Sequence, residues 1–313
     1  MKIAVDAMGG NLAPDHVVIG AAQALKSFTE ADSLVLLGDK SVIQASCEKL
    51  QISHQLFELH HAPEVIGIDE HPTKALAQKQ HSSIAEGFHL LKNKEIRAFC
   101  GAGNSGAMQM GALFSVKPIE GVIRPSLAGL VPKEDGGYAL LLDTGANTDV
   151  RQDVLLQFGE LGSIYAANMM GIENPRVALL NLGKEEGRGT LFTQAAYQLY
   201  SGSSKVNFIG NIDGSDLFNN KADVIVCDGF TGNVASKMIE AFYDLLKKRN
   251  FLDDFFTRFN YEAVGGSPIL GVNGNVVVGH DASSPEAIKN MILLAYRMAE
   301  TNFYQKIKVA FGD

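Results

Sequence analysis

The sequence predicts an α/β fold in which a mainly parallel sheet is sandwiched between helices. Two observations support this class: short apolar runs alternate with helical stretches along the 313 residues, and several apolar runs end in glycine with Asp, Asn, Ser or Thr. Such alternation favours a parallel sheet covered on both faces. A chain with 46% hydrophobic and 20% charged residues is typical of a globular protein. At this length we expect one α/β catalytic unit over 1–313, or two intimately joined lobes.

The first half of the chain follows the alternation closely. A strand over 3–5 ends at Asp6, turns through Gly9 and Gly10, and leads to a helix that starts at or near Pro14. Further strands are expected in SLVLLGD (33–39), HQLFELHHA (54–62) and IRAFCGAGNSG (96–106), with helices over about 42–50, 74–91 and 107–116. These are the units from which parallel sheets are built.

The middle of the chain interrupts the alternation. In SLAGLVPKEDGGYALLLD (126–143), two apolar runs are joined through Asp135, Gly136 and Gly137, which predicts an antiparallel hairpin. Such a hairpin suits a lobe boundary or a dimer arm. Strands then resume in PRVALLNLG (175–183), KVNFIGNI (205–212) and ADVIVCDGF (222–230), and a last helix starts at about Pro285.

Charge and cysteine usage restrict the class of protein. A net charge of −8 and a pI near 5.5 argue against a nucleic-acid binder, which needs a basic face. Cys47, Cys100 and Cys227 are odd in number, lack paired spacing and lie in or beside apolar runs, so we expect reduced core thiols and neither a disulfide framework nor a metal site. No signal peptide or membrane-spanning run is recognised, so we expect a cytoplasmic protein.

Polar residues at the strand ends are the main functional signal. Four segments carry them: VDAMGGN, CGAGNSGA, LLNLGKEE and VCDGFTGN. Because ligands of open α/β sheets bind outside the carboxyl ends of the strands, we expect these four segments to meet at one site. Besides backbone N–H groups and hydroxyls they supply amides, two carboxylates and a nearby cation: Asn11, Asn104, Asn181, Asn233, Asp6, Asp228 and Lys237. Such a set suits phosphate and an acyl oxygen that becomes negative during transfer.

Several other chemistries lack their motifs. GAGNSGA begins like a dinucleotide fingerprint, but the acidic residue expected after it is represented only by Glu120, outside any strand end. Neither a GxxxxGK[ST] loop, a GxSxG elbow around Ser105, nor an HExxH sequence is present. His60 and His61 are adjacent and would face opposite sides of a strand, which favours a core or surface role over a metal site.

Seven segments together resemble the bacterial phosphate acyltransferase family of phospholipid synthesis, PlsX. They are MKIAVDAMGG, GAGNSGAMQMGALF, LLDTGAN, ENPRVALLNLGKEE, FIGNI, ADVIVCDGFTGN and GGSPILGVNG. The resemblance implies an enzyme that moves a long fatty acyl chain from acyl carrier protein to inorganic phosphate, giving acyl phosphate for the next acyltransferase. It also implies a homodimer, a fold similar to isocitrate dehydrogenase and phosphotransacetylase, and no metal or nucleotide cofactor.

The resemblance also implies roles for the residues at the strand ends. Phosphate and the transferring acyl group would be held by Gly9, Gly10, Asn11, Asn104, Ser105, Gly106, Asn181, Gly232 and Asn233. Lys237 would neutralise charge, while Asp6 and Asp228 would orient donors or handle a proton, so the catalytic set is Asp6, Asp228, Asn233 and Lys237. The chain departs from the family at two positions: Asn11 replaces a usual aspartate and Ala77 a usual arginine.

An aromatic stripe near residue 255 has several interpretations. Phe251, Leu252, Phe255, Phe256 and Phe259 recur at helical spacing on one side of a predicted helix. They could pack in the core, face a dimer partner, or contact a membrane or acyl chain. The preceding basic cluster, 247–249, favours an anionic lipid surface, and the resemblance implies peripheral membrane contact at the inner face, with hand-off of product to a membrane acyltransferase. The same cluster could instead receive acidic acyl carrier protein.

Three other functions stay open from the sequence. One is a small-acyl phosphotransacetylase that uses coenzyme A, and another is a dehydrogenase on the same fold, which the missing ribose-binding acid argues against. The third is a non-catalytic acyl- or phosphate-binding relative, which the departures at Asn11 and Ala77 make conceivable.

Overall fold

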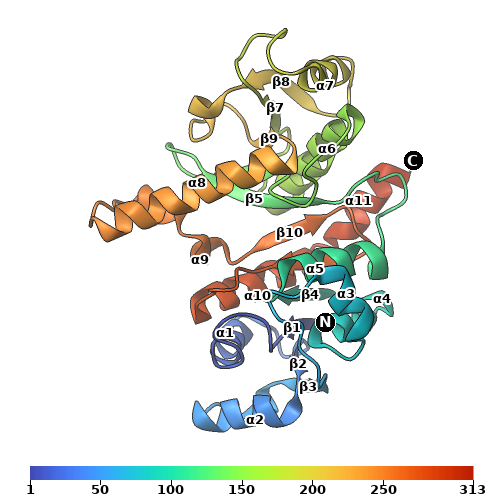
Figure 1. Ribbon diagram of the computed structural model, residues 1–313, viewed down its shortest axis with the longest axis vertical. Coiled ribbons are helices and arrows are strands. Elements are labelled where there is room, and N and C mark those ends of the chain that lie inside the picture. The colour runs from blue at the N-terminus through green and yellow to red at the C-terminus, as the bar shows by residue number, and fades with distance from the viewer. Residues whose placement is uncertain (313) are drawn as a thin grey trace. The chain divides into compact units, whose positions relative to one another are not determined.

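The computed structural model describes residues 1–312, which fold as two compact units (Figure 1). Unit 1 comprises residues 1–119 and 261–305, and unit 2 comprises residues 120–260 and 306–312. Each unit is built around its own run of paired strands and is described by itself.

The strands of unit 1 are paired in the order β3-β2-β1-β4-β11-β10. Their bounds are β1 Lys2–Asp6, β2 Ser33–Gly38, β3 Glu58–His61, β4 Ala98–Gly101, β10 Ser267–Leu270 and β11 Asn275–Val278. All these neighbours are parallel except β10 and β11, which are antiparallel. Because β1 and β4 are parallel and adjacent, their carboxyl ends lie side by side at one edge of the sheet.

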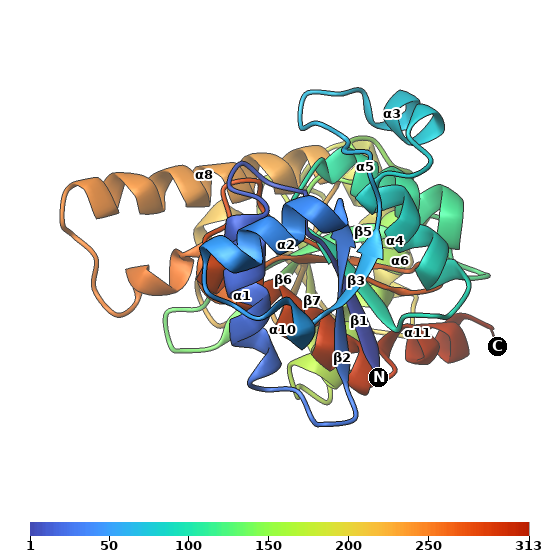
Figure 2. The same ribbon diagram turned by 90° about the horizontal axis from the view of Figure 1, so that it is seen from below.

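Helices cover both faces of this sheet (Figure 2). Their bounds are α1 Asp15–Leu25, α2 Lys40–Lys49, η1 His54–Leu56, α3 Pro72–Gln78, α4 Ser83–Lys92, α5 Ser105–Gly111, η2 Ala112–Val116, α9 Tyr261–Val264 and α10 Pro285–Glu300. Helices α1 and α10 pack together on one face, and α4 and α5 lie on the other. The helix α11, Phe303–Gly312, begins in unit 1 and ends in unit 2.

Unit 2 contains five strands in the order β5-β6-β9-β7-β8. The first two form the predicted hairpin, and β6 is also the first of four parallel strands. The strand bounds are β5 Ser126–Pro132, β6 Tyr138–Leu142, β7 Arg176–Leu180, β8 Asn207–Ile212 and β9 Val224–Val226. Strands β5 and β6 are antiparallel, with Leu130 opposite Leu140, so the hairpin prediction is confirmed. Strands β6, β9, β7 and β8 are mutually parallel, so their carboxyl ends lie along one edge.

Two long helices cover opposite faces of the unit 2 sheet. The helices of the unit are α6 Gln152–Met169, α7 Leu191–Ser201, η3 Gly214–Asp216, α8 Gly229–Lys248 and η4 Phe256–Phe259. Leu141 and Ile225 belong to a buried cluster against which Ile239 of α8 packs. Their neighbours Leu142 and Val224 point the other way and contact α6 at Gly162. This alternation is the period-two pattern of a sheet covered on both faces.

Two predicted elements of unit 1 differ in extent from the structure. The helix expected over 74–91 is broken into α3 and α4, because Ser82 caps α4 by accepting the Ala85 N–H at 3.3 Å. The strand expected over 54–62 is limited to β3, since η1 occupies the residues before it. Local apolar spacing does not register such interruptions.

The helix predicted for the aromatic stripe is wrong. Helix α8 ends at Lys248, and only the short 3-10 turn η4 follows. Phe259 is buried with its ring 5.2 Å from that of Phe218, whereas Phe251 is exposed. Arg258 donates to the carbonyl oxygen of Lys133 at 2.9 Å and so ties this segment to the hairpin turn. Over residues 1–312, no helix has the length and apolar character needed to cross a membrane.

Candidate functional site

The turns after β1 and β4 meet at one edge of unit 1. A Cβ atom placed on Gly9 would lie 2.7 Å from the backbone nitrogen of Gly103 and would also overlap the Asp6 carboxylate. Any side chain at position 9 would therefore push the two turns apart, which is why glycine stands there. Gly10 has a φ of +108°, a conformation that glycine adopts without strain.

Asp6 is buried beneath these turns and does not reach the surface. It is 1% exposed, and its Oδ1 accepts the Met8 N–H at 3.0 Å. Burial raises the pKa of this carboxyl, although hydrogen bonds from Ser83, Met8 and Gly9 act in the opposite direction. The carboxylate is thus placed to shape the glycine turn, and direct contact with a substrate would require the turn to open.

Both polar atoms of the Asn104 side chain form hydrogen bonds within the protein. Its Nδ2 donates towards the carbonyl oxygens of Gly67, Ile68 and Glu70 at 2.9, 3.1 and 2.9 Å, and its Oδ1 caps α5 by accepting the Ala107 N–H at 2.9 Å. At 4% exposure it is a positioning residue that ties the loop before α3 to α5.

The two residues that follow Asn104 differ from each other. A Cβ on Gly106 would overlap the ring of Pro72, so this glycine permits α3 to pack closely on α5. Ser105 is exposed and remains available to a ligand. Of the three residues predicted in this segment to bind substrate, only Ser105 presents its side chain to solvent.

The structure gives a physical reason for asparagine at position 11. Asn11 donates its backbone N–H to the carbonyl oxygen of Asp281 at 2.8 Å, and its Nδ2 lies 3.3 Å from Oδ2 of the same aspartate. An aspartate at position 11 would bring two carboxylates together. The second departure, Ala77, is exposed on α3, and nothing in the structure explains it.

Asp143, at the end of β6, organises the edge of unit 2, and the sequence interpretation did not assign it to the site. It is fully buried, and its carboxylate accepts N–H groups of Leu127, Ala146 and Asn147 at 2.9, 3.2 and 2.6 Å. Burial raises the pKa of Asp143, and these hydrogen bonds partly offset the effect. The signal that could have found it is LLDTGAN, a strand ending in Asp before a glycine turn.

The start of α8 packs against this turn. Asp228 caps the helix, accepting the Thr231 N–H at 2.9 Å and the Thr231 hydroxyl at 2.8 Å. A Cβ on Gly232 would overlap the carbonyl oxygen of Asp143, so the glycine permits the contact. The side chain of Asn233 completes it by donating to the carbonyl oxygen of Thr144 at 3.3 Å.

Asn233 and Lys237 present polar groups at the carboxyl end of β9. Both are exposed, and they lie one helical turn apart on α8. The Nζ of Lys237 lies 2.6 Å from the carboxylate of Glu240, one turn further along. This pair of residues therefore offers a cation and an amide donor that an anion could reach.

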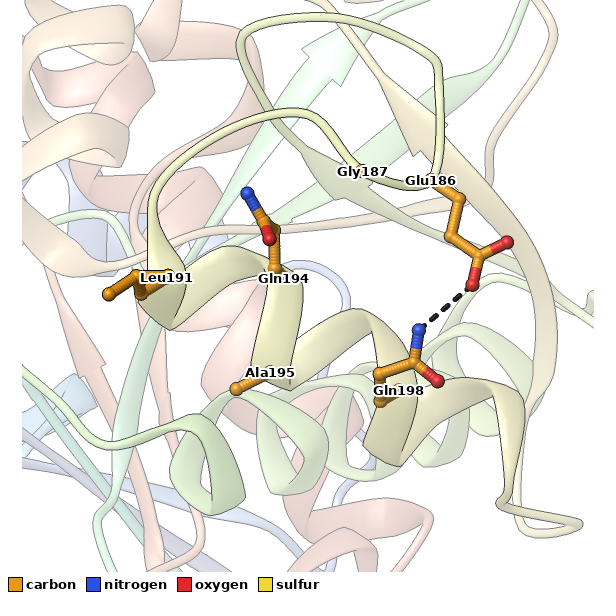
Figure 3. Close-up of a pocket in the computed structure, with 6 residues that line it drawn as sticks. All are labelled: Glu186, Gly187, Leu191, Gln194, Ala195 and Gln198. Carbon is orange, nitrogen blue, oxygen red and sulfur yellow. Dashed lines mark hydrogen bonds between the residues drawn. The ribbon is translucent and has the colours of Figure 1, made fainter.

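Asn181 lies at the end of β7 and shapes the loop that follows. Its Oδ1 accepts the Leu182 N–H at 2.8 Å, and its Nδ2 donates to the carbonyl oxygen of Arg188 at 3.1 Å. Beside this loop is an open pocket of about 550 Å³ (Figure 3). The residues that line it are Glu186, Gly187, Leu191, Gln194, Ala195 and Gln198.

The predicted meeting of the strand ends is therefore observed within each unit. Unit 1 brings together the turns after β1 and β4, while unit 2 aligns those after β6, β9 and β7. That all four predicted segments form one site stays a prediction.

The thiols and metal-ligand residues offer little further chemistry. Cys47, Cys100 and Cys227 are all buried, and burial raises the pKa of each thiol. Such thiols are poor nucleophiles because the reactive thiolate is disfavoured. Within the part of the chain that the structure describes, no three His, Cys, Asp or Glu side chains cluster in a way that could hold a metal ion.

The arrangement of strands and helices defines the class of protein. It is similar to a phosphotransacetylase from Streptococcus pyogenes, with a TM-score of 0.67 and 17% identity over 96% of this chain and 94% of that one. At this identity the likeness shows the fold alone, and it confirms the predicted phosphotransacetylase-like α/β class.

Sequence comparison then identifies the family. Residues 1–249 and 245–306 match the family described as fatty acid synthesis protein. A phosphate acyltransferase of Acetivibrio thermocellus is 41% identical over 99% of this chain and 96% of its own length. A phosphate acyltransferase of Dictyoglomus turgidum is 37% identical over 98% of this chain and 96% of its own length. The chain belongs to this family, the phosphate acyltransferases of phospholipid synthesis, so the sequence-based recognition and the prediction of an acyltransferase are confirmed.

Proposed function

We propose that this acyltransferase moves a long fatty acyl chain from the thioester of acyl carrier protein to inorganic phosphate. The observation that carries the proposal is the exposed pair Asn233 and Lys237 at the carboxyl end of β9. A cation and an amide donor on a rigid helix suit a phosphate anion and the oxyanion that forms when it attacks a carbonyl. The family membership supports the same acceptor, because the relatives are named phosphate acyltransferases.

The reaction needs no nucleophile from the protein. A phosphate oxygen attacks the thioester carbonyl, the new C–O bond forms, and the C–S bond breaks to give acyl phosphate and the free thiol of the carrier. Holding the two reactants together supplies much of the acceleration. This route agrees with the burial of all three cysteines.

The predicted site residues divide into two groups in this proposal. In unit 2, Lys237 and Asn233 contact the reactants directly. In unit 1, Ser105 and the backbone N–H groups of the Gly9 and Gly10 turn stay predicted ligands of phosphate or thioester. The positioning group holds the turns in shape: Asp6, Asn11, Asn104, Gly106, Asn181, Asp228 and Gly232. We therefore move Asp6 and Asp228 from the catalytic set to positioning roles, since one is buried and the other caps α8.

The decisive experiment is thiol release from a long-chain acyl carrier protein thioester, measured with and without phosphate. Phosphate-dependent release, with acyl phosphate trapped by hydroxylamine, would establish the transfer. Release from acetyl-coenzyme A alone would instead indicate a small-acyl phosphotransacetylase. Absence of release from either donor would favour a non-catalytic binding relative.

A second copy of this chain is proposed to cover one side of α8. Five apolar side chains form an exposed stripe along this helix: Phe230, Val234, Met238, Phe242 and Leu245. The stripe spans about 22 Å at the rise of an α-helix, and exposed apolar surface of this extent marks an interaction site. Homodimerisation through α8 would bury it. Light scattering that reports a monomer would contradict this assignment.

Peripheral membrane contact is proposed at the end of α8. Phe251 is exposed, and the basic cluster 247–249 precedes it, a combination that favours an anionic lipid surface. Of the predicted stripe, Phe259 belongs to the core instead. Vesicle flotation should show binding to anionic vesicles that the substitution Phe251→Ser weakens, and equal flotation of both proteins would contradict the contact. Acyl phosphate released there would be close to a membrane acyltransferase.

A further inference from the structure

A third turn joins the edge of unit 1 where the turns after β1 and β4 meet. It follows β11, and the sequence interpretation assigned none of its residues to the site. The Gly279 N–H donates to the carbonyl oxygen of Gly101 at 2.8 Å, directly after β4. Two residues further on, the carbonyl oxygen of Asp281 accepts the Asn11 N–H at 2.8 Å. His280 therefore lies between a contact to the turn after β4 and a contact to the turn after β1.

The imidazole of His280 is held on one side by a carboxylate. Its Nδ1 lies 2.8 Å from Oδ1 of Asp281 and 3.2 Å from the backbone nitrogen of Ala282. An ionised carboxylate only accepts hydrogen bonds, so Nδ1 carries a proton in the shorter contact. The other carboxylate oxygen, Oδ2, lies 3.3 Å from Nδ2 of Asn11. The amide of Asn11, the carboxylate of Asp281 and the imidazole thus form a chain that orients the ring.

The second nitrogen of the ring, Nε2, is free to meet a ligand. The side chain of His280 is 37% exposed, and the ring of Tyr261 packs against it with the ring centroids 5.0 Å apart. Among the described residues 1–312, Nε2 finds neither a hydrogen-bond partner nor an ion-pair partner. A histidine with Nδ1 on a carboxylate and an unpartnered Nε2 has the arrangement of a general acid–base group.

We infer that His280 is a catalytic residue that carries a proton from phosphate to the sulfur of the leaving thiol. This inference rests on the proposed function, in which phosphate attacks a thioester. The hydrogen phosphate dianion holds a proton that the acyl phosphate dianion lacks, so one proton moves from phosphate to sulfur in each turnover. Nε2 takes this proton as the C–O bond forms, and gives it to sulfur as the C–S bond breaks and its electron pair leaves with sulfur. Because phosphate and sulfur are bonded to the same carbon in the tetrahedral intermediate, one ring nitrogen serves both.

The surroundings of the loop determine which control a pH experiment needs. The other titratable side chains on the neighbouring elements are Asp6, Asp15, His16, Tyr261, Glu262 and Glu286. Asp6 is buried, while Asp15 and Glu286 form ion pairs with lysines. The Nδ1 of His16 lies 3.2 Å from the carbonyl oxygen of Ser283 in the same loop. Since histidine is the side chain that ordinarily titrates between pH 5 and 8, His16 is the group that must be separated from His280.

The test measures phosphate-dependent thiol release from a long-chain acyl carrier protein thioester from about pH 5 to 9. The proteins are the wild type, His280→Asn and the control His16→Asn. The amide of the His280→Asn variant can donate to Asp281 in place of Nδ1, but it does not titrate. Acid–base catalysis contributes about 100-fold or more, so this variant should lose about 100-fold in kcat, with a KM for phosphate close to that of the wild type.

The pH profile separates a proton relay from a structural role. Phosphate itself titrates in the same range in all three proteins, so an ionisation of kcat/KM that is lost only in His280→Asn belongs to His280. His280→Gln, whose amide takes the place of Nε2, is a second variant and should show the same losses. Melting temperatures should show that each variant is folded, because the substituted ring is partly exposed.

A lower kcat with the ionisation lost in the His280 variants, and a wild-type profile in His16→Asn, would support the relay. Wild-type kcat in either His280 variant would overturn the relay and leave the proposed function standing. An equal loss in His16→Asn, an unchanged profile shape, or unfolding of both His280 variants would mark a structural role and also overturn it. If the wild type releases no thiol in response to phosphate, the proposed function fails and the relay fails with it.

Discussion

Replacing Lys237 by methionine should separate catalysis from stability. The lysine side chain is 54% exposed and forms an ion pair with Glu240 at 2.6 Å. Exposed ion pairs contribute about 0.2–1 kcal/mol to folding, so the melting temperature should change by no more than a few degrees. If Lys237 stabilises the phosphate and the oxyanion, its loss should reduce phosphate-dependent thiol release about 100-fold, or ~2.7 kcal/mol of transition-state stabilisation.

The matched control for this variant is Lys92→Met, because Lys92 is an exposed helical lysine in the last turn of α4 to which no binding role is assigned. It should retain wild-type turnover. Glu240→Gln should leave turnover unchanged or lower the KM for phosphate, since it removes an anion that competes for Lys237. Wild-type kcat and KM in Lys237→Met would refute the role of this residue, and equal losses in both lysine variants would point to a general charge effect.

Three further predictions concern the turns and the core. Gly232→Ala should destabilise the protein by about 2 kcal/mol or more in denaturant titration, because the added methyl group meets backbone atoms. The control is Gly214→Ala, whose methyl group would meet nothing within 4 Å. Equal stability of the two variants would contradict the packing argument. Asn11→Asp should lower the melting temperature at pH 7 but not at pH 3, where protonation relieves repulsion by Asp281; a pH-independent loss would exclude this cause. Burial raises the folded-state pKa of Glu160 above its usual 4.5, so its ionised form destabilises the fold as the pH rises through that range. Glu160→Gln should consequently be more stable than wild type at pH 7, with a smaller difference at pH 4, and an unchanged melting curve at pH 7 would contradict it.

Asn104 illustrates what residue type reveals about a site and what it leaves open. The segment GAGNSG predicted a strand end, a glycine turn and a polar amide, and all three are present. The partners of the amide are the carbonyl groups of residues 67–70, more than 30 positions earlier in the chain. Nothing in the local sequence specifies whether an asparagine at a strand end faces a ligand or a distant loop.

The aromatic stripe shows the same limit for periodicity. The spacing of Phe251, Phe255 and Phe259 is helical, yet the segment contains only the short 3-10 turn η4 over Phe256–Phe259, and Arg258 of this turn bonds to the hairpin of unit 2. Tertiary contacts, including the rings of Phe218 and Phe259, determine that conformation. The structure does contain an exposed apolar stripe, but it lies on α8, where the sequence pattern did not predict one.

The sequence by itself determined the fold class, the family, the parallel strands and the hairpin. These features depend on local alternation of apolar and polar residues and on motifs that survive in order along the chain. Only the tertiary structure decided which strand-end residues face solvent and which form hydrogen bonds to other loops. It also revealed Asp143 as the centre of a turn and placed the loop of His280 beside the turns after β1 and β4. Hydrogen-bond partners and burial depend on segments that are distant in sequence, and a single-sequence pattern does not encode that proximity.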